Sequence, residues 1–426
     1  MSKKSIKKSP SKVLSLTILF LESLFPFKAI VERHVDPKKK WRHRVFGGLT
    51  DRAAFLVIKR LLNLSYQDLA SLLDEKFVQG CQNPRKITPK GVQKALVMVP
   101  VALVQELFGA CNAVPNSREQ LMQALQQDLG VPFKTIIADG TGLTCPGTKA
   151  NLEVYKPHQS GNKVGLPQIR AVYNLNPVSS LIVNAELKPF QGPKTGEITT
   201  FIEHLKHYSA GTVWVLDGLF DCQPVIQAIQ EQDQLFVING NRRKTDFRKG
   251  TALGPKDCLQ SNEDGSSTRS LEAVYSRTQV PFPMILRTNL TDAKQEVMNI
   301  YEERWGIETM IGNTKGVIGL DYIDAHTPEE VQRQWITGLL ATNVITLTMQ
   351  QGLRHLLKSP PKSSKKAKET KSLPRISFKN AKKRILDAFK AAHHWSTENL
   401  PKLLDRLVER ISEAVIIERP HRSYAR

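Results

Sequence analysis

Thr135-Ile-Ile-Ala-Asp139-Gly-Thr-Gly142 is the stretch where the chain changes from helical to strand-like patterns. Its apolar, β-branched run predicts a short buried strand, and the Asp-Gly pair predicts a turn where that strand ends. Thr212-Val-Trp-Val-Leu-Asp217-Gly218 repeats the arrangement. Taken singly, Asp139 and Asp217 are each explained by an ordinary Asp-Gly turn. Whether these two aspartates also have a function depends on the helices and strands around them.

The elements that follow the first strand define a fold class. Further strands are predicted at 169–173, 181–183 and 235–238, and helices at 197–208 and 224–230. Three early strands followed by alternating helix and strand match an RNase H-like mixed sheet better than a doubly wound one. Strand-like runs at 271–275 and 284–287 indicate a β-rich insertion at about 240–290. We therefore expect an α/β fold, an RNase H-like mixed sheet flanked by helices.

Helical regions are expected on both sides of this sheet. Residues 1–130 are predicted to form a helical, basic DNA-binding region, whose pattern fits a helix-turn-helix reader or a plain helical bundle. The catalytic domain is expected at 131–355 and includes the insertion. Residues 356–376 form a basic, low-complexity linker, and 377–426 a helical C-terminal region.

The composition indicates a polyanionic partner. The 426 residues contain 61 Lys and Arg against 40 Asp and Glu, a formal charge of +21. Nucleic acid is the first choice of partner and an anionic membrane surface the second. The five cysteines form no CxxC pair, which argues against a zinc module and suits a reducing cytosol. The apolar stretch from Val13 to Ile30 resembles a secretory signal, but Glu22 and Pro26 favour a helix of the folded protein.

A second informative stretch is Tyr301-Glu-Glu-Arg304-Trp-Gly-Ile-Glu308, with Lys315 following. At about 100° per residue on a helix, these four side chains fall within an arc of about 60°. One helical stripe would then present a phenol, a guanidinium, a carboxylate and an ammonium, which suits a metal ion beside phosphate oxygens. A solvated helix face with an Arg304–Glu308 ion pair is the alternative.

Two strand-end aspartates and a helical glutamate form the donor set that two-metal phosphoryl transfer requires. Hard Mg²⁺ ions need anionic oxygen ligands, and they activate the attacking oxygen and stabilise the leaving one. Asp139, Asp217 and Glu308 are the candidate catalytic and metal-binding residues. Another basic patch, Arg242-Arg243-Lys244, suits contacts to DNA phosphates, although a solvated loop explains it nearly as well.

These motifs resemble those of DDE transposases of the insertion-sequence-four family. The family's Y-x2-R-x3-E-x6-K signature matches Tyr301, Arg304, Glu308 and Lys315 without a gap. Its two aspartate motifs resemble the segments around Asp139 and Asp217. The resemblance covers about 130–350 well, and the flanking regions only in general character.

The resemblance implies cut-and-paste transposition of an insertion sequence. The three acids would hold two Mg²⁺ ions, for which Mn²⁺ may substitute, and Tyr301, Arg304 and Lys315 would bind phosphates near the cut. Partners would be double-stranded DNA at the terminal inverted repeats and at the target, bound by a homodimer in the cytoplasm at the nucleoid, with no membrane. The alternative is a catalytically silent, transposase-derived DNA-binding regulator. A paired-carboxylate glycosidase would have no use for the positive charge.

Overall fold

The computed structural model describes residues 12–36, 46, 48–77, 88–113, 132, 134–160, 163–241, 245–261, 265, 267–275, 281–358 and 375–415. The chain divides into two compact units. The sheet unit holds the described residues between Asn116 and Gly312. The helical unit holds those up to Pro115 together with those from Asn313 to Ile416. Each unit is described by itself.

Ten strands from the described residues form one sheet in the sheet unit. They are β1 (Thr135–Thr144), β2 (Pro157–Ser160), β3 (Lys163–Asn176), β4 (Leu181–Pro189), β5 (Val213–Leu216), β6 (Leu235–Asn239), β7 (Thr251–Gly254), β8 (Asp257–Ser261), β9 (Ser267–Tyr275) and β10 (Phe282–Thr288). The helices are α8 (Lys149–Val154), α9 (Glu197–Leu205), the 3₁₀ turn η2 (Gly218–Phe220), α10 (Gln223–Gln230), α11 (Lys294–Glu302) and α12 (Trp305–Gly312).

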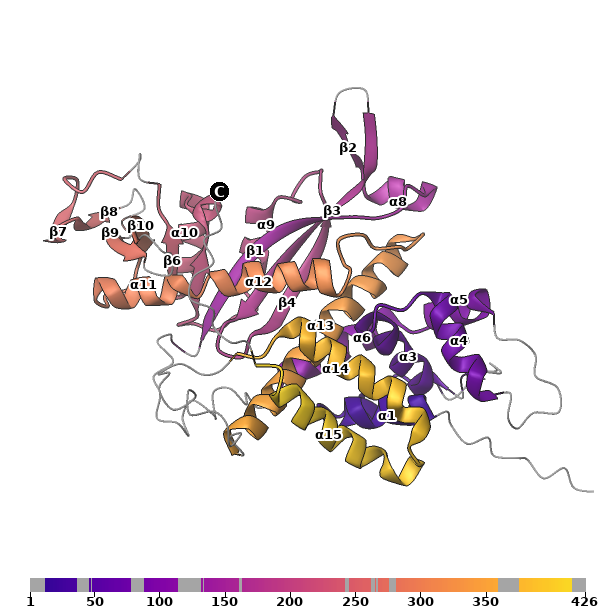
Figure 1. Ribbon diagram of the computed structural model, residues 1–426. Helices are drawn as coiled ribbons and strands as arrows, with labels where there is room; N and C mark the ends of the chain where they lie inside the picture. Colours follow the sequence, from indigo (N-terminus) through magenta and orange to yellow (C-terminus); the bar gives the residue numbers. More distant parts are fainter. Residues whose placement is uncertain are drawn as a thin grey trace, which may run out of the picture. The chain divides into compact units, whose positions relative to one another are not determined.

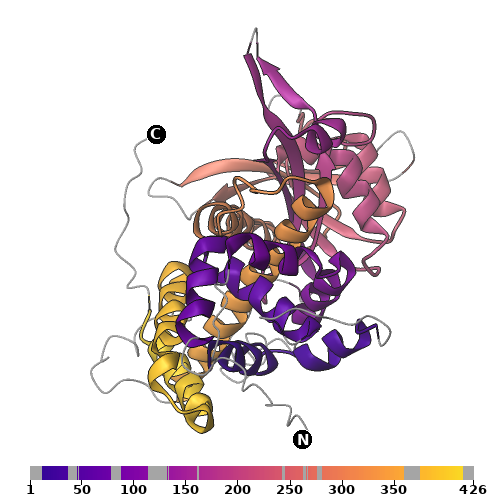
Figure 2. The ribbon, with the colours of Figure 1, turned by 90° about the vertical axis from the view of Figure 1, so that its right-hand side faces the viewer.

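The strand order confirms the predicted RNase H-like mixed sheet. β4, β3 and β1 pair antiparallel, and β1, β5 and β6 then pair in parallel. The short strands β5 and β6 are buried, apolar runs, as expected for parallel strands covered on both faces. β3 is longer than its neighbours, and its first half forms with β2 a hairpin that extends beyond the other strands (Figure 2).

The β-rich insertion is also confirmed, and it continues the same sheet. β10 pairs antiparallel with β6, and β9, β8 and β7 follow in order as antiparallel neighbours. Arg269 of β9 anchors this extension, because its buried guanidinium binds both carboxylate oxygens of Asp257 at 2.9 and 2.8 Å. The chain then returns to the sheet through α11.

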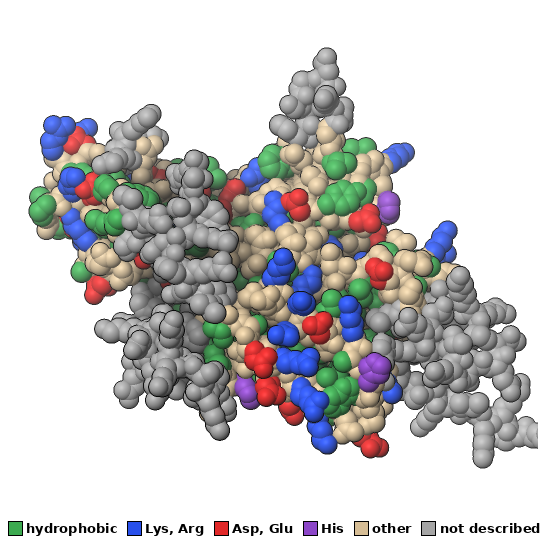
Figure 3. All heavy atoms as spheres, in the orientation of Figure 1, with side chains coloured by type: hydrophobic (Ala, Val, Ile, Leu, Met, Phe, Trp, Pro, Cys, Tyr) green, Lys and Arg blue, Asp and Glu red, His purple; other side chains and the backbone are tan. Residues whose placement is uncertain are grey.

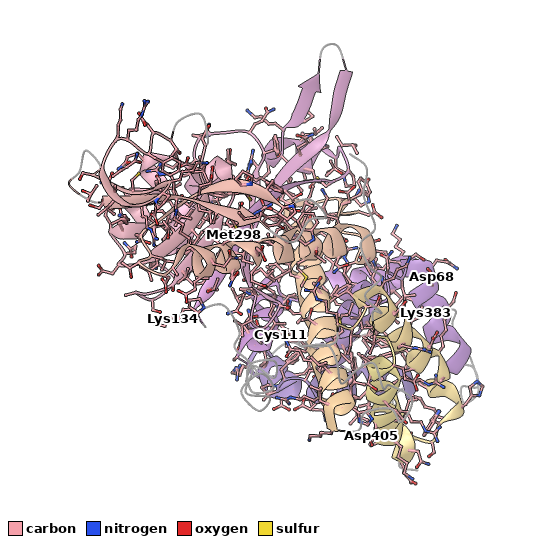
Figure 4. The ribbon with its side chains drawn as sticks, turned by 60° about the vertical axis from the view of Figure 1, so that its left-hand side comes forward. Asp68, Cys111, Lys134, Met298, Lys383 and Asp405 are labelled. Atoms are coloured by element: carbon pink, nitrogen blue, oxygen red, sulfur yellow. The ribbon has the colours of Figure 1, made fainter. Side chains whose placement is uncertain are left out.

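Helices cover both faces of the central strands. On one face, α9 and α10 pack on alternate residues of β1, β5 and β6, including Ala138, Trp214 and Ile238. Phe201 of α9 contacts the Trp214 ring edge-on at a centroid distance of 4.9 Å. On the opposite face, α11 and α12 cross the sheet (Figure 1). Figure 4 marks Met298 of α11, whose side chain is fully buried.

The helical unit comprises α1 (Lys12–Glu22), α2 (Phe27–Arg33), α3 (Leu49–Leu61), α4 (Tyr66–Phe77), α5 (Pro89–Val97), α6 (Val101–Asn112), η3 (Asn313–Val317), α13 (Pro328–Lys358), α14 (Phe378–Ala391), η5 (Ala392–His394), η6 (Thr397–Asn399) and α15 (Leu400–Ser412). The long helix α13 is buried over most of its length and packs on α3, α6 and α15. Lys and Arg, mixed with Asp and Glu, gather over α14 and α15 (Figure 3).

The apolar stretch near the N-terminus forms two helices of this unit rather than one span. α1 and α2 meet at a bend of 97° near Pro26, and both bury apolar side chains. Within the described residues no single helix is long and apolar enough to cross a membrane; two bent helix pairs meet the length and composition criteria together.

Candidate active site

Asp139 on β1 and Asp217, which directly follows the neighbouring parallel strand β5, stand at matching positions. The β1–β5 ladder pairs Ile137 with Val215, and each aspartate lies two residues further along its own chain. Side chains two residues apart on extended backbone point to the same face, and neighbouring strands lie about 4.8 Å apart. Both carboxylates therefore project on the face of Ile137 and Val215, opposite the face that α9 and α10 cover.

Local hydrogen bonds orient the two aspartates. Oδ1 of Asp139 accepts a hydrogen bond of 2.8 Å from the amide of Gly140. Oδ1 of Asp217 accepts one of 2.8 Å from the amide of Leu219 and so caps the 3₁₀ turn η2. Among the described residues, no hydrogen bond to the second oxygen of either carboxylate is formed. Each aspartate thus keeps one oxygen available for a ligand.

Glu308 approaches from α12, which packs on this same face. Gly306 of α12 lies against Leu175 of β3, the residue paired with Ile137, and a Cβ on Gly306 would be 3.6 Å from the Leu175 side chain. The Glu308 side chain is about one-third exposed, at 36%. It forms an ion pair with Arg304 one turn earlier. The strands and α12 therefore bring the three predicted acids to one face of the sheet.

The segment from Tyr301 to Lys315 is not the single regular helix that the sequence predicts. α11 ends at Glu302, a turn occupies residues 303 and 304, and α12 begins at Trp305. A π-helical turn follows α12 and contains Lys315. Glycine is a poor helix former, and Gly306 and Gly312 lie near these irregularities. A π-turn also holds more residues than an α-turn, so a constant angle of 100° per residue does not apply here.

The three acids interact electrostatically. Burial raises the pKa of Asp139 to about 6, and the negative charges of Asp217 and Glu308 act in the same direction. The Gly140 amide and the Arg304 guanidinium oppose this change without cancelling it. Burial and the neighbouring carboxylates therefore both disfavour the charge of Asp139 in this site, and a bound metal cation would favour it.

Tyr301 and Arg304 form the basic and phenolic side of the site. The Arg304 guanidinium lies 5.9 Å from the Tyr301 ring centroid. Burial raises the pKa of Tyr301 to about 12. Burial also disfavours the charge of Arg304, yet the neighbouring Tyr301 and Glu308 raise its pKa overall. Arg304 is consequently a fixed positive charge beside the three acids.

The remaining predicted DNA contacts are Lys315 and the patch 242–244. Lys315 belongs to the helical unit, where its ammonium pairs with Asp321 Oδ1 at 3.0 Å. Arg242, Arg243 and Lys244 lie outside the described residues.

The donor chemistry of the three acids fits a hard divalent cation, since carboxylate oxygens are the ligands that Mg²⁺ and Mn²⁺ prefer. Of the His, Cys, Asp and Glu side chains that the structure describes, no three converge closely enough to hold one ion as they stand. Each acid instead accepts a hydrogen bond from a donor of the protein: Asp139 from Gly140, Asp217 from Leu219 and Glu308 from Arg304. Coordination would require these side chains to turn toward a shared ion.

A further acid near the site, Glu197, is absent from the sequence-based prediction. It begins α9, and its buried carboxylate lies against Gly140 and pairs with Arg170 at 3.3 Å. Burial raises the pKa of Glu197, and the charge of Asp139 is the next cause. In the sequence Glu197 is an ordinary acidic residue in a first helical turn. Its only sequence signal is the glycine at position 140, directly after Asp139.

Comparisons with known proteins identify a family for half of the chain. A family model described as a transposase DDE domain matches residues 132–344, which is half of the chain. Among solved structures, the chain is similar to a piggyBac transposase synaptic complex with hairpin DNA determined by cryo-electron microscopy. That alignment has 12% identity and a TM-score of 0.43, and it covers 98% of this chain and 88% of the other. No curated protein matches the chain.

Proposed function

Because the chain belongs to the family of transposase DDE domains, we propose that it is an active transposase that moves an insertion sequence by cutting and pasting DNA. Within the DDE transposases, we propose the insertion-sequence-four family, because the spacing of Tyr301, Arg304, Glu308 and Lys315 matches its signature. The observation that carries the proposal is the position of Asp139 and Asp217, which stand level on adjacent parallel strands and face the helix of Glu308.

In this proposal Asp139, Asp217 and Glu308 hold two Mg²⁺ ions, or Mn²⁺ in their place. The ions supply charge stabilisation to the attacking and leaving oxygens of an in-line displacement at phosphorus. Hydrolysis of the phosphodiester at the element's end frees a 3′-hydroxyl. This hydroxyl attacks a phosphodiester of the opposite strand, which forms a hairpin on the element's end and releases the 3′-hydroxyl of the flanking DNA. A second hydrolysis opens the hairpin and restores the element's 3′-hydroxyl. That hydroxyl then attacks a target phosphodiester, so that the element's 3′ end is joined to the target's 5′-phosphate and the target's 3′-hydroxyl is released.

The chain's cations have a separate role, which is to hold the DNA backbone. Arg304, fixed between Tyr301 and Glu308, would bind a phosphate beside the cut by charge-assisted hydrogen bonds. Tyr301 and Lys315 would also bind phosphates near the cut, and the patch 242–244 would provide further phosphate contacts. The helical basic region before residue 131 would bind the terminal inverted repeats, and a homodimer would bridge the two ends of the element.

The direct test is Mg²⁺-dependent nicking of DNA that carries the element's own terminal repeats. The Glu308→Gln variant should lose at least about 100-fold in cleavage rate, because one anionic metal ligand is gone. Its binding to the same DNA should be nearly unchanged. Glu303→Gln, in the neighbouring turn, is the matched control and should cleave as the wild type does.

Cleavage by Glu308→Gln at close to the wild-type rate would refute the catalytic assignment. A wild-type protein that binds the repeats but never cleaves them would instead favour the alternative, a catalytically silent regulator derived from a transposase.

A further inference from the structure

Glu197 comes unusually close to the strand that carries Asp139. A Cβ atom on Gly140 would lie 2.3 Å from Cδ of Glu197 and 2.5 Å from both carboxylate oxygens. Gly140 does not have a positive φ, so its backbone conformation does not demand glycine. A strand glycine without that demand marks a place where another group approaches the backbone closely. Here that group is a carboxylate.

The environment of Glu197 is poorly suited to a purely structural ion pair. Its side chain is 12% exposed, and the single ion pair that the described residues give it is a 3.3 Å contact to Nη1 of Arg170. Arg170 also lies 4.5 Å from the Phe190 ring centroid, and its buried Nε has no acceptor among the described residues. A guanidinium placed to neutralise a carboxylate commonly forms two parallel hydrogen bonds. Arg170 forms one.

The pairing between β1 and β5 ends close to the point where Glu197 approaches β1. The β1–β5 ladder ends at the pair Ile137–Val215, so no pair of these two strands lies between the faces on the β5 side of Asp139. On its other side, Asp139 still pairs with Tyr173 of β3. Glu308 reaches this level from the α12 side, and Glu197 reaches it from the α9 side. Buried like charges are costly unless a cation is shared among them. Glu197 and Asp139 thus approach the same stretch of β1 from opposite faces of the sheet.

We propose that Glu197 is a fourth carboxylate of the catalytic centre and supplies an oxygen ligand to the divalent cation held by Asp139. The proposal rests on the proposed function, because it assumes that Asp139 binds such an ion. It gives Gly140 a defined role, which is to let the Glu197 carboxylate reach the ion. Arg170 then balances the charge of Glu197 from the side away from the metal.

The test is Mn²⁺ binding to the full chain without DNA, measured by isothermal titration calorimetry. The Glu197→Gln variant should bind Mn²⁺ about tenfold more weakly than the wild type, the order of effect found for lost ligand interactions. Glu203→Gln is the matched control, because Glu203 lies on the same helix and pairs with Lys188 at 2.9 Å. Its affinity should stay within twofold of the wild-type value.

Two further variants separate metal binding from ion pairing and from misfolding. Arg170→Ala removes the same ion pair as Glu197→Gln but should keep Mn²⁺ affinity at the wild-type level or above it. Glu197→Asp keeps the charge but withdraws it by one methylene, and should also bind more weakly. If Glu197→Gln fails to fold, Glu197→Asp provides the same comparison.

The proposal would be overturned if Glu197→Gln bound Mn²⁺ as tightly as the wild type while Asp139→Asn bound it weakly in the same assay. If only Glu197→Asp folds, the same comparison applies to that variant. A parallel loss of affinity in Arg170→Ala would also overturn it, since the ion pair alone would then explain the effect. If the wild type itself binds no Mn²⁺, the proposed function fails first, and this proposal fails with it.

Discussion

Replacing Asp139 by Asn should stabilise the folded chain in the absence of divalent ions. The change removes a negative charge from a site crowded with carboxylates and keeps the oxygen that accepts the Gly140 amide hydrogen bond. The pKa of Asp139 is about 6 in the folded chain, against an ordinary value of 3.8. A difference of about 2 pH units corresponds to about 3 kcal/mol. Because the side chain is partly exposed, we expect about 1 to 3 kcal/mol.

Because the pKa of Asp139 is higher in the folded chain than in the unfolded chain, the stability difference between the variant and the wild type depends on pH. Below about pH 4 Asp139 carries its proton in both the folded and the unfolded chain, so the variant gains little. As the pH rises from about 4 to about 6, the unfolded chain loses this proton first. The free energy of unfolding of the wild type therefore falls relative to that of the variant, and above about pH 6 the difference is constant.

The assay is urea denaturation of both proteins in EDTA at a series of pH values, with the free energy of unfolding extrapolated to water. Adding Mg²⁺ should stabilise the wild type and leave Asp139→Asn nearly unchanged, because only the wild type has the ligand. A variant that is less stable than the wild type at pH 8 in EDTA would refute the reasoning. It would mean that favourable contacts of the Asp139 carboxylate outweigh the cost of its burial and the repulsion from the neighbouring carboxylates.

Two other predictions concern the contacts to DNA phosphates and the hydrophobic core. Arg304→Ala and Lys315→Ala should each weaken the retention of cleaved DNA ends in a gel-shift assay. Each should also make DNA binding less salt-dependent, because about one phosphate contact is lost. Unchanged retention in both variants would mean that the two residues have only a structural role. Phe201→Ala should lower the free energy of unfolding by about 3 to 5 kcal/mol, because this fully buried ring packs edge-on against Trp214 and Phe220. A loss below about 1 kcal/mol in chemical denaturation would contradict the importance of the α9 contact.

The strands and the order of the acids were predictable from the sequence because they depend on local patterns. Apolar runs such as 135–138 and 212–216 identify short buried strands, and the alternation of helices and strands fixes the sheet type. For Asp217 this places the carboxylate directly after β5, as predicted. For Asp139 the predicted turn is wrong, because β1 continues through Asp139, which pairs with Tyr173 of β3, and ends at Thr144. This reasoning yields the RNase H-like sheet and its insertion, which the structure confirms.

The register and the irregular helix were not predictable in the same way. No local pattern states that Ile137 pairs with Val215, yet this pairing brings the two aspartates level. The turn at residues 303 and 304 depends on how α11 and α12 each pack on the sheet. The approach of Glu197 to Gly140 likewise results from the packing of α9 on β1, which sequence spacing does not reveal.

Anomalous X-ray diffraction from crystals of the full chain grown with Mn²⁺ would test the shared metal site most directly. The account predicts Mn²⁺ density within about 2.0 to 2.3 Å of carboxylate oxygens from both Asp139 and Asp217, with Glu308 turned away from Arg304 toward the ion. Density bound elsewhere on the chain, with Asp139 and Asp217 free of metal at ion concentrations that support DNA cleavage, would contradict it.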